Sequence, residues 1–269
     1  IDRIFLHERT GSIALQSLFA DGRSVKRPEQ VFCAMDHIVD TFADRSDNTL
    51  MPSGKQFIQA TRAASKKAGI QLFDIHDKSQ GIAHVVAAEE GIALPGLTHV
   101  CPDSHTCTLG GLGSFAWGIG STEAEHALAT KTLALYKPKS MRVIFDGELQ
   151  PGVTAKDLIL HLIRLHGADG GSGYAVEFAG DAITTLPVEG RMTICNMAVE
   201  FSAFSGFCAV DSKTIQYVKD RPYSPDGENW KNASRAWLDL HSDHNAIFDK
   251  EIFINCADIQ PTVSWGTNP

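Results

Sequence analysis

The sequence predicts an α/β fold, in which short buried strands alternate with helices along the whole chain. Two observations predict it. Short apolar runs are bounded by polar, glycine or proline residues and are followed by longer segments with helical periodicity. The same strand–helix–strand order recurs in both halves, which is typical of parallel sheets built from βαβ units. A chain of 269 residues, with 43% hydrophobic and 21% charged residues, is long enough for two such domains.

The first domain is predicted to cover residues 1–138. Its clearest helix runs from about Gly54 to Ala68, because Gly69 follows as a C-cap residue that tolerates the left-handed conformation. The buried strand 31–35 ends directly at a polar Asp–His pair. The other elements expected here are strands at 70–74 and 98–101 and helices over 11–19, over 122–135 and from near residue 82.

The composition changes near Pro138, where we place the boundary to a second domain, residues 139–269. One of its helices follows Pro151 and begins with a T-x-x-D capping box formed by Thr154 and Asp157. The other elements expected here are strands at 141–149, 174–180 and 251–255, and helices within 191–206 and 230–240.

The stretch 100–132 combines polar side chains with many small residues. Asp103, Ser104 and His105 stand in consecutive positions, and a glycine-rich run and a helix start at Ser121 follow. Glycine lets the main chain approach a ligand or a neighbouring backbone closely. The pattern indicates a polar site, and an ordinary loop-to-helix turn with polar capping is the alternative that the residues leave open.

Further residues are candidates for acid–base chemistry, each with a structural alternative. Asp36 and His37 follow a strand at its carboxyl end, where open α/β sheets bind ligands, although a charged pair can also simply close a strand. His84 lies in an apolar helix start, which is also typical of a core histidine. Glu200 stands four residues after Asn196, on one helix face in largely apolar company. It needs a partner if it is buried, and an exposed helical glutamate is the alternative.

The charge and the cysteines exclude several classes of protein. The net charge is −8 and the Lys and Arg residues are scattered, so no nucleic-acid binding is expected. An anionic substrate would need a local positive site. No apolar run approaches the length of a membrane span and no signal peptide opens the chain, so no membrane association is expected. The six cysteines form no C-x-x-C pair, which favours a reducing compartment: the cytoplasm, or an organellar matrix or stroma.

Five segments together resemble the aconitase superfamily, and within it the large subunits of 3-isopropylmalate dehydratases. They follow the family order: DHIVDT (36–41), GIAH (81–84), CPDSHTCTLGGLGSFAWGIGSTEAEHALAT (101–130), GRMTICNMAVE (190–200) and VSWGTNP (263–269). The resemblance implies aconitase-like three-layer α/β/α domains. It also implies that the chain is the N-terminal portion only, without the third, cluster-binding domain.

The resemblance implies a hydro-lyase that isomerises a hydroxy-dicarboxylic or tricarboxylic acid by dehydration and rehydration. The closest match within the family acts on 2-isopropylmalate, to give 3-isopropylmalate in leucine biosynthesis. Members of the family bind a [4Fe–4S] cluster, in which the iron without a cysteine ligand acts as a Lewis acid on the substrate.

Three acid–histidine pairs match the catalytic pairs of the family. Such pairing orients an imidazole and raises its pKa, which suits a proton donor. The first pair would serve the leaving hydroxyl, and two further residues, Ser104 and Asn196, would lie near the substrate or the cluster. The implied pairs are Asp36 with His37, Asp103 with His84, and Glu200 with His105.

The sequence also departs from the family pattern. The cluster cysteines of the family lie C-terminal to the WGTNP segment, so no metal ligand is predicted and no cluster is expected on this chain alone. Position 13 is Ile where the family often has Gln, and Asp40 precedes Thr41. We expect part of a larger subunit that is inactive alone, takes a small hydroxy acid and pairs with the small subunit of the dehydratase. Two alternatives stay open: a related substrate (citramalate, dimethylmalate or homoaconitate), or a non-catalytic aconitase-like protein.

Overall fold

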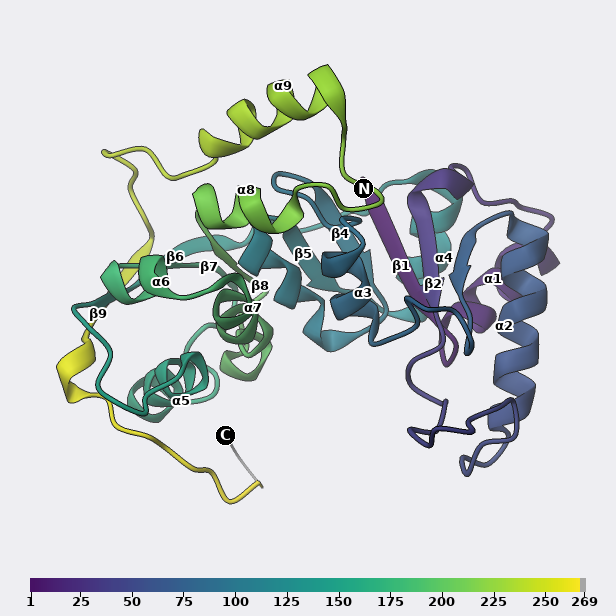
Figure 1. Ribbon diagram of the computed structural model, residues 1–269, viewed down its shortest axis with the longest axis horizontal. Coiled ribbons are helices and arrows are strands. Elements are labelled where there is room, and N and C mark those ends of the chain that lie inside the picture. The colour runs from purple at the N-terminus through teal and green to yellow at the C-terminus, as the bar shows by residue number, and fades with distance from the viewer. Residues whose placement is uncertain (267–269) are drawn as a thin grey trace.

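The computed structural model describes residues 1–266, which form two parallel sheets flanked by helices (Figure 1). The first sheet has the strand order β3-β2-β1-β4-β5 and the second has the order β8-β7-β6-β9. The predicted α/β fold is therefore confirmed. The strands are β1 (Arg3–His7), β2 (Val31–Ala34), β3 (Gln71–Phe73), β4 (Thr98–Cys101), β5 (Phe115–Gly118), β6 (Lys139–Asp146), β7 (Tyr174–Ala179), β8 (Ser205–Cys208) and β9 (Lys250–Asn255).

Helices cover both faces of the first sheet, because successive side chains of a strand point to opposite faces. Ile4 and Leu6 of β1 pack on one face with Leu15 and Leu128, which belong to two helices. Phe5 packs on the other face, in a separate cluster. The result is the three-layer arrangement expected for this half. Its helices are α1 (Gly11–Ala20), α2 (Gly54–Ala68), α3 (Ala83–Glu89) and α4 (Ser121–Thr130), with the 3₁₀ helices η1 (Pro28–Gln30) and η2 (Ser104–Leu112).

The second sheet buries mainly one face. Met141, Val143 and Phe145 of β6 form a core with the helices on that side. The opposite face carries Arg142 and Glu177 and is covered in part by the segment 239–249. The helices of this half are α5 (Ala155–His166), α6 (Asp181–Thr185), α7 (Val188–Asn196), α8 (Ser212–Val218) and α9 (Gly227–Leu238), with η3 (Val199–Phe201) and η4 (Cys256–Asp258).

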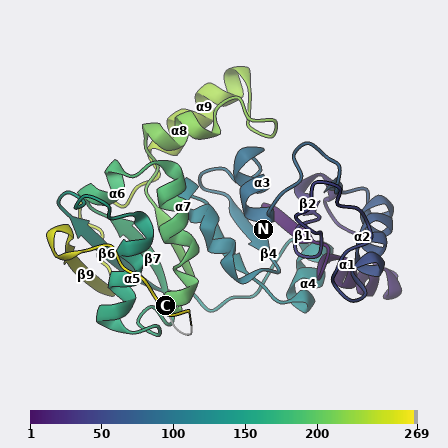
Figure 2. The same ribbon diagram turned by 60° about the horizontal axis from the view of Figure 1, so that its bottom comes forward.

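Glycines allow the two halves to pack backbone against backbone. A Cβ atom on Gly110 would lie 1.8 Å from the carbonyl oxygen of Gly206, and one on Gly111 would lie 2.5 Å from the nitrogen of Met192. Only glycine permits this approach of η2 to β8 and α7. Figure 2 shows α7 standing between the second sheet and the first half. The second sheet begins at Lys139, and the proposed domain boundary at residue 138 stays a prediction.

Predicted helix 122–135 is wrong at its end, because α4 stops at Thr130. Lys131 takes the left-handed conformation, with φ of 64°. The hydroxyl of Thr130 accepts a hydrogen bond from the backbone N–H of Thr132 at 3.1 Å. A side chain that bonds nearby backbone in this way competes with the helical ladder.

The predicted continuous helix within 191–206 is also wrong, because α7 ends at Asn196 and Glu200 belongs to η3. Ser202 takes the left-handed conformation, with φ of 62°, and turns the chain into β8. Strand β5 was not predicted, because its short FAWG sequence lies among glycines. It forms by pairing with β4.

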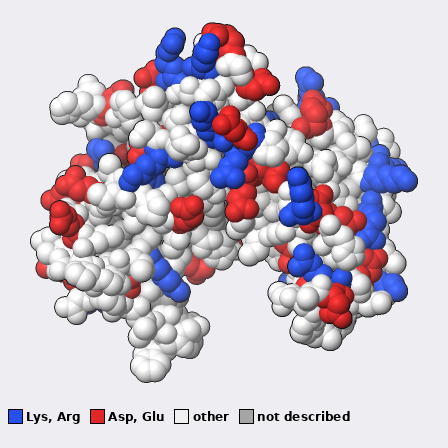
Figure 3. Space-filling view, in the orientation of Figure 1, with Lys and Arg blue, Asp and Glu red and all other residues white. Residues whose placement is uncertain are grey.

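The surface carries charges of both signs. On the face shown in Figure 3, basic and acidic side chains alternate, and the lower edge is notched between the two halves. Within residues 1–266, no helix combines the length and the apolar character needed to cross a bilayer.

Candidate active site

The sheet order brings together residues that are distant in the sequence. Strands β2, β1 and β4 are neighbours and all run parallel. His7 ends β1, Asp36 and His37 follow β2, and Asp103 follows β4. These side chains therefore lie at the carboxyl edge of the sheet, where open α/β folds bind ligands.

Asp103 binds two histidines at once. Its Oδ1 lies 3.0 Å from Nε2 of His84, and its Oδ2 lies 3.1 Å from Nε2 of His37. The backbone N–H of His105 donates to the same Oδ1 at 2.8 Å. Burial alone would raise the pKa of Asp103, but the hydrogen bonds from His37 and His84 outweigh it and hold that pKa well below its ordinary value. Asp103 is thus a carboxylate at the centre of the site.

His37 lies between two carboxylates. Its Nε2 faces Asp103 and its Nδ1 is hydrogen-bonded to Asp36. These two hydrogen bonds, with Asp103 the larger contributor, raise the pKa of His37 to about 10 although burial opposes them. The side chain is 31% exposed, whereas that of Asp36 is 2% exposed. A protonated imidazole is therefore presented to the open side of the site.

We predict that His37 stays protonated throughout the neutral pH range. Because its pKa is raised from 6.5 to about 10, the stability that its charge contributes is complete below pH 6.5 and is lost as the pH rises toward 10. An NMR titration of the histidine ring nitrogens measures this directly. A His37 midpoint near 6.5 would contradict the network, and replacing both Asp36 and Asp103 by Asn should lower the midpoint.

His84 is part of this network, unlike a satisfied core histidine. Its side chain is 8% exposed and its Nε2 is bonded to Asp103. Asp36 holds the start of α3 in place, since its Oδ2 accepts the backbone N–H of Ala83 at 2.8 Å. The Nδ1 of His84 is buried and has no hydrogen-bond partner in the part of the chain that the structure describes. The buried carboxylate of Asp36 therefore positions both His37 and α3, the helix that carries His84.

The third pair joins the two halves of the molecule. Nε2 of His105, on η2, lies 2.9 Å from Oε1 of Glu200, on η3. The hydroxyl of Ser104 lies 3.0 Å from Nδ1 of the same imidazole. The His105 and Glu200 side chains are 36% and 40% exposed. Both nitrogens of His105 therefore have a partner, and the pair faces solvent.

Asn196 acts on this pair indirectly. Its Nδ2 donates to the hydroxyl of Thr108 at 2.8 Å, and that hydroxyl donates to the carbonyl oxygen of His105 at 2.6 Å. The structure thus places Asn196 behind η2, where it positions the backbone of His105.

Sequence reasoning missed two residues at the end of β1. The imidazole of His7 stacks on that of His37 with ring centroids 3.8 Å apart. Burial, and then the charge of His37, lower the pKa of His7. Glu8 is fully buried and accepts the backbone N–H groups of Asp36, at 2.9 Å, and of Ile38. The sequence did contain an indication of this site, because a histidine and an acid, His7 and Glu8, stand at the end of β1 just as Asp36 and His37 follow β2.

A hollow of about 420 Å³ borders the network. Asp103 and Ser104 line it from the first half, with the backbone of Gly118, and Val199 and Phe204 line it from the second half. Its volume lies in the range of about 300–1,000 Å³ that is typical of ligand pockets. A small hydroxy acid therefore has room beside Asp103 and Ser104.

The cysteines do not fit the ligand set of an iron–sulfur cluster. All six are buried free thiols. Burial raises the pKa of Cys33, Cys101 and Cys195 well above the ordinary value. Cluster ligands are thiolates, which these environments disfavour. No role for these cysteines in holding a cluster follows from the structure.

Four other side chains lie close enough to hold a single ion. The ligand atoms of His7, Glu8, Asp36 and His37 lie within 4.8 Å of one another, the one such group in the described part of the chain. Both carboxylates already accept backbone N–H groups, and the two imidazoles stack face to face. In this arrangement the stacked ring of His7 fixes the position of His37, and Asp36 favours its protonated form.

Comparison with known proteins shows the family of the chain. The sequence matches the Aconitase family (aconitate hydratase) over residues 1–269. It is 49% identical over all 269 residues to "3-isopropylmalate dehydratase large subunit 1" of Bradyrhizobium diazoefficiens and covers 56% of that protein. The chain thus spans about half the length of this relative. Since the family match extends over every residue, the chain belongs to the aconitase family.

Proposed function

We propose that this chain provides the acid–base groups of a hydro-lyase that isomerises 2-isopropylmalate to 3-isopropylmalate. The observation that carries the proposal is the continuous hydrogen-bonded network around Asp103, next to a hollow of substrate size. The 49% identity to a relative named 3-isopropylmalate dehydratase large subunit supports the choice of substrate. The residues assigned to catalysis are Asp36, His37, His84, Asp103, His105 and Glu200.

The dehydration step needs a proton for the leaving hydroxyl group. His37 suits this role, because Asp36 and Asp103 keep its imidazole protonated and its ring is partly exposed. Hydroxide is far more basic than a neutral imidazole, so proton transfer to the leaving group is favourable even from a histidine with a high pKa. Rehydration reverses this transfer.

The other pairs orient polar groups around the substrate. Asp103 fixes the ring of His84 through Nε2, and Glu200 fixes the ring of His105. A carboxylate on one ring nitrogen fixes the tautomer and orientation of the imidazole, while the second nitrogen of His105 meets the hydroxyl of Ser104. Ser104 and Asn196 support His105 from its two sides.

We further propose that turnover needs the [4Fe–4S] cluster of the family and a small-subunit partner. The relative is named as a large subunit, which supports the partner, and membership of the aconitase family supports the cluster. We also propose a reducing compartment, the cytoplasm or an organellar matrix. The six cysteines form no C-x-x-C pair, which favours a compartment where thiols stay reduced.

The test is an assay of the intact subunit with its partner, after reconstitution with iron and sulfide. We expect 2-isopropylmalate to give the highest kcat/KM in a panel that includes citramalate, dimethylmalate and homoaconitate. A preference for another member of the panel would overturn the assignment of 2-isopropylmalate as substrate but leave the proposed reaction class in place. No turnover of any member would overturn the function and favour a non-catalytic protein on this fold.

We predict that Glu200→Gln lowers kcat by about 10²-fold, because an amide can present its NH₂ group in place of the carboxylate oxygen that orients the His105 ring. Steady-state kinetics of the intact enzyme measure this effect. The melting temperature should stay unchanged, since the Glu200 side chain is 40% exposed. The matched control is Glu189→Gln, an exposed residue of α7. Equal losses in the two variants would contradict the role of Glu200.

A further inference from the structure

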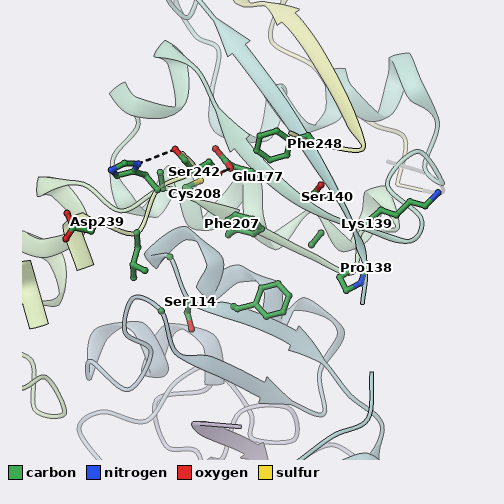
Figure 4. Close-up of a pocket in the computed structure, with 17 residues that line it drawn as sticks. Ser114, Pro138, Lys139, Ser140, Glu177, Phe207, Cys208, Asp239, Ser242 and Phe248 are labelled. Atoms are coloured by element: carbon green, nitrogen blue, oxygen red, sulfur yellow. Dashed lines mark hydrogen bonds between the residues drawn. The ribbon is translucent and has the colours of Figure 1, made fainter. Parts of the chain in front are cut away.

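A second hollow of about 420 Å³ lies away from the acid–histidine network (Figure 4). Gly96 and Ser114, which line it, precede β4 and β5, so the hollow lies at the amino ends of these strands. The catalytic candidates lie at the carboxyl ends. Strands β7 and β8 of the second sheet form another wall, and the segment 239–248 forms the roof. The proposed dehydration does not use this cavity.

Most of the cavity wall is apolar. Phe207 lies below Phe248 and above Ser114 in Figure 4, while the amino group of Lys139 points away from the other lining residues. Phe115 and Leu240 complete the apolar lining. Three aromatic rings around one space favour a branched or aromatic hydrocarbon group.

The polar end of the cavity is lined by Glu177, His241 and Ser242, and Arg142 lies beside Glu177 in an adjoining hollow. Glu177 is 3% exposed, although it lies on the less covered face of the second sheet. It accepts a hydrogen bond from the hydroxyl of Ser242, on the roof segment. Arg142, its register partner on β6, places Nε 3.4 Å from Oε1 of Glu177.

The hydrogen-bonding capacity of Arg142 is largely unused. Its Nε is buried and makes no hydrogen bond to any described residue, and its guanidinium lies 5.2 Å from the ring centre of Phe248. Arg142 lines a smaller hollow of about 230 Å³ that shares Glu177, His241 and Ser242 with the cavity. A carboxylate and a guanidinium thus stand side by side where the apolar chamber ends.

We propose that this cavity binds the zwitterion of an α-amino acid with an apolar side chain. The ammonium group pairs with Glu177, the carboxylate pairs with Arg142, and the side chain lies among the aromatic rings. A zwitterion matches both members of the ion pair. A ligand with only one charge would match only one of the two groups, either the buried Glu177 or Arg142, whose side chain is 32% exposed but whose Nε is buried. The roof segment contacts both charged residues, through Ser242 and Phe248, and closes over the ligand.

Calorimetric titration of the intact protein with L-leucine tests the proposal. We expect saturable binding that weakens at least about tenfold for 4-methylpentanoate, which lacks the ammonium, and for 3-methylbutylamine, which lacks the carboxylate. Glycine, which lacks the side chain, should not bind measurably. No binding of L-leucine up to about 10 mM, or equal binding of the singly charged analogues, would overturn the proposal.

Variants locate the binding. Glu177→Gln should weaken L-leucine binding at least about tenfold. Glu251→Gln should not, because Glu251 is the exposed register partner of Arg142 on the opposite strand, β9. If Glu177→Gln fails to fold, hydrogen exchange of the wild-type protein replaces it as the test. L-leucine should slow the exchange of backbone amides within 242–248. Unchanged exchange there would overturn the proposed site. These readouts measure binding, so a failure of the proposed dehydratase function does not affect them.

Discussion

Asp103→Asn is expected to lower kcat of the intact, reconstituted enzyme by about 10³-fold or more. Asp103 is the one carboxylate that contacts both His37 and His84. An amide carries no charge, so it can no longer hold His37 protonated, and its nitrogen would present a donor to one of the two imidazoles. The loss should appear in kcat more than in KM, because the network is proposed to serve the proton transfers.

The same variant has a readout that does not depend on turnover. The pKa of His37, about 10 in the native protein, should fall, since the hydrogen bond that His37 donates to Asp103 is the largest of the effects that raise it. Asp44→Asn is the matched control, because Asp44 is an exposed acid of the loop that follows His37. An Asp103→Asn variant with native kcat and an unchanged titration midpoint of His37 would contradict the role assigned to Asp103.

Gly110→Ala is expected to destabilise the fold by more than about 4 kcal/mol, or to prevent folding. The added Cβ would lie 1.8 Å from the carbonyl oxygen of Gly206, a backbone atom within β8. Neither backbone can withdraw without separating η2 from the second sheet, because the neighbouring Gly111 is also confined, with its Cβ position 2.5 Å from the nitrogen of Met192 in α7. Urea unfolding followed by circular dichroism measures the loss.

Gly81→Ala is the control for this steric effect. Its Cβ would meet its nearest neighbour, Val86, at an ordinary 3.5 Å, and its φ is not positive. We expect a change within about 0.5 kcal/mol. If Gly110→Ala were equally mild, the two halves would not be held together by the contact between η2 and β8.

The sequence predicts those elements whose signals are local. Helix α2 ends at Ala68 because Gly69 takes the left-handed conformation, and the capping box of Thr154 and Asp157 starts α5. The errors arise where tertiary contacts decide. The chain leaves α7 after Asn196 in order to enter β8, and β5 is a strand because β4 lies beside it.

The candidate site shows the same division. Motif resemblance identified the acids and histidines, and the structure brings the three expected pairs within hydrogen-bond distance. The motif resemblance did not indicate that Asp103 contacts two histidines, because this contact depends on β1 lying between β2 and β4. Glu8 escaped notice because a glutamate after a strand is common, and its two backbone partners are visible only in the fold. Of the WGTNP motif, Thr267, Asn268 and Pro269 lie outside the described residues.

A double-mutant cycle on Asp103 and His84 tests the central claim most directly. If Asp103 and the histidines act as one unit, Asp103→Asn combined with His84→Gln should reduce kcat to within about threefold of Asp103→Asn alone. If the two losses multiply, the residues act independently, and a shared acid–base network centred on Asp103 is contradicted.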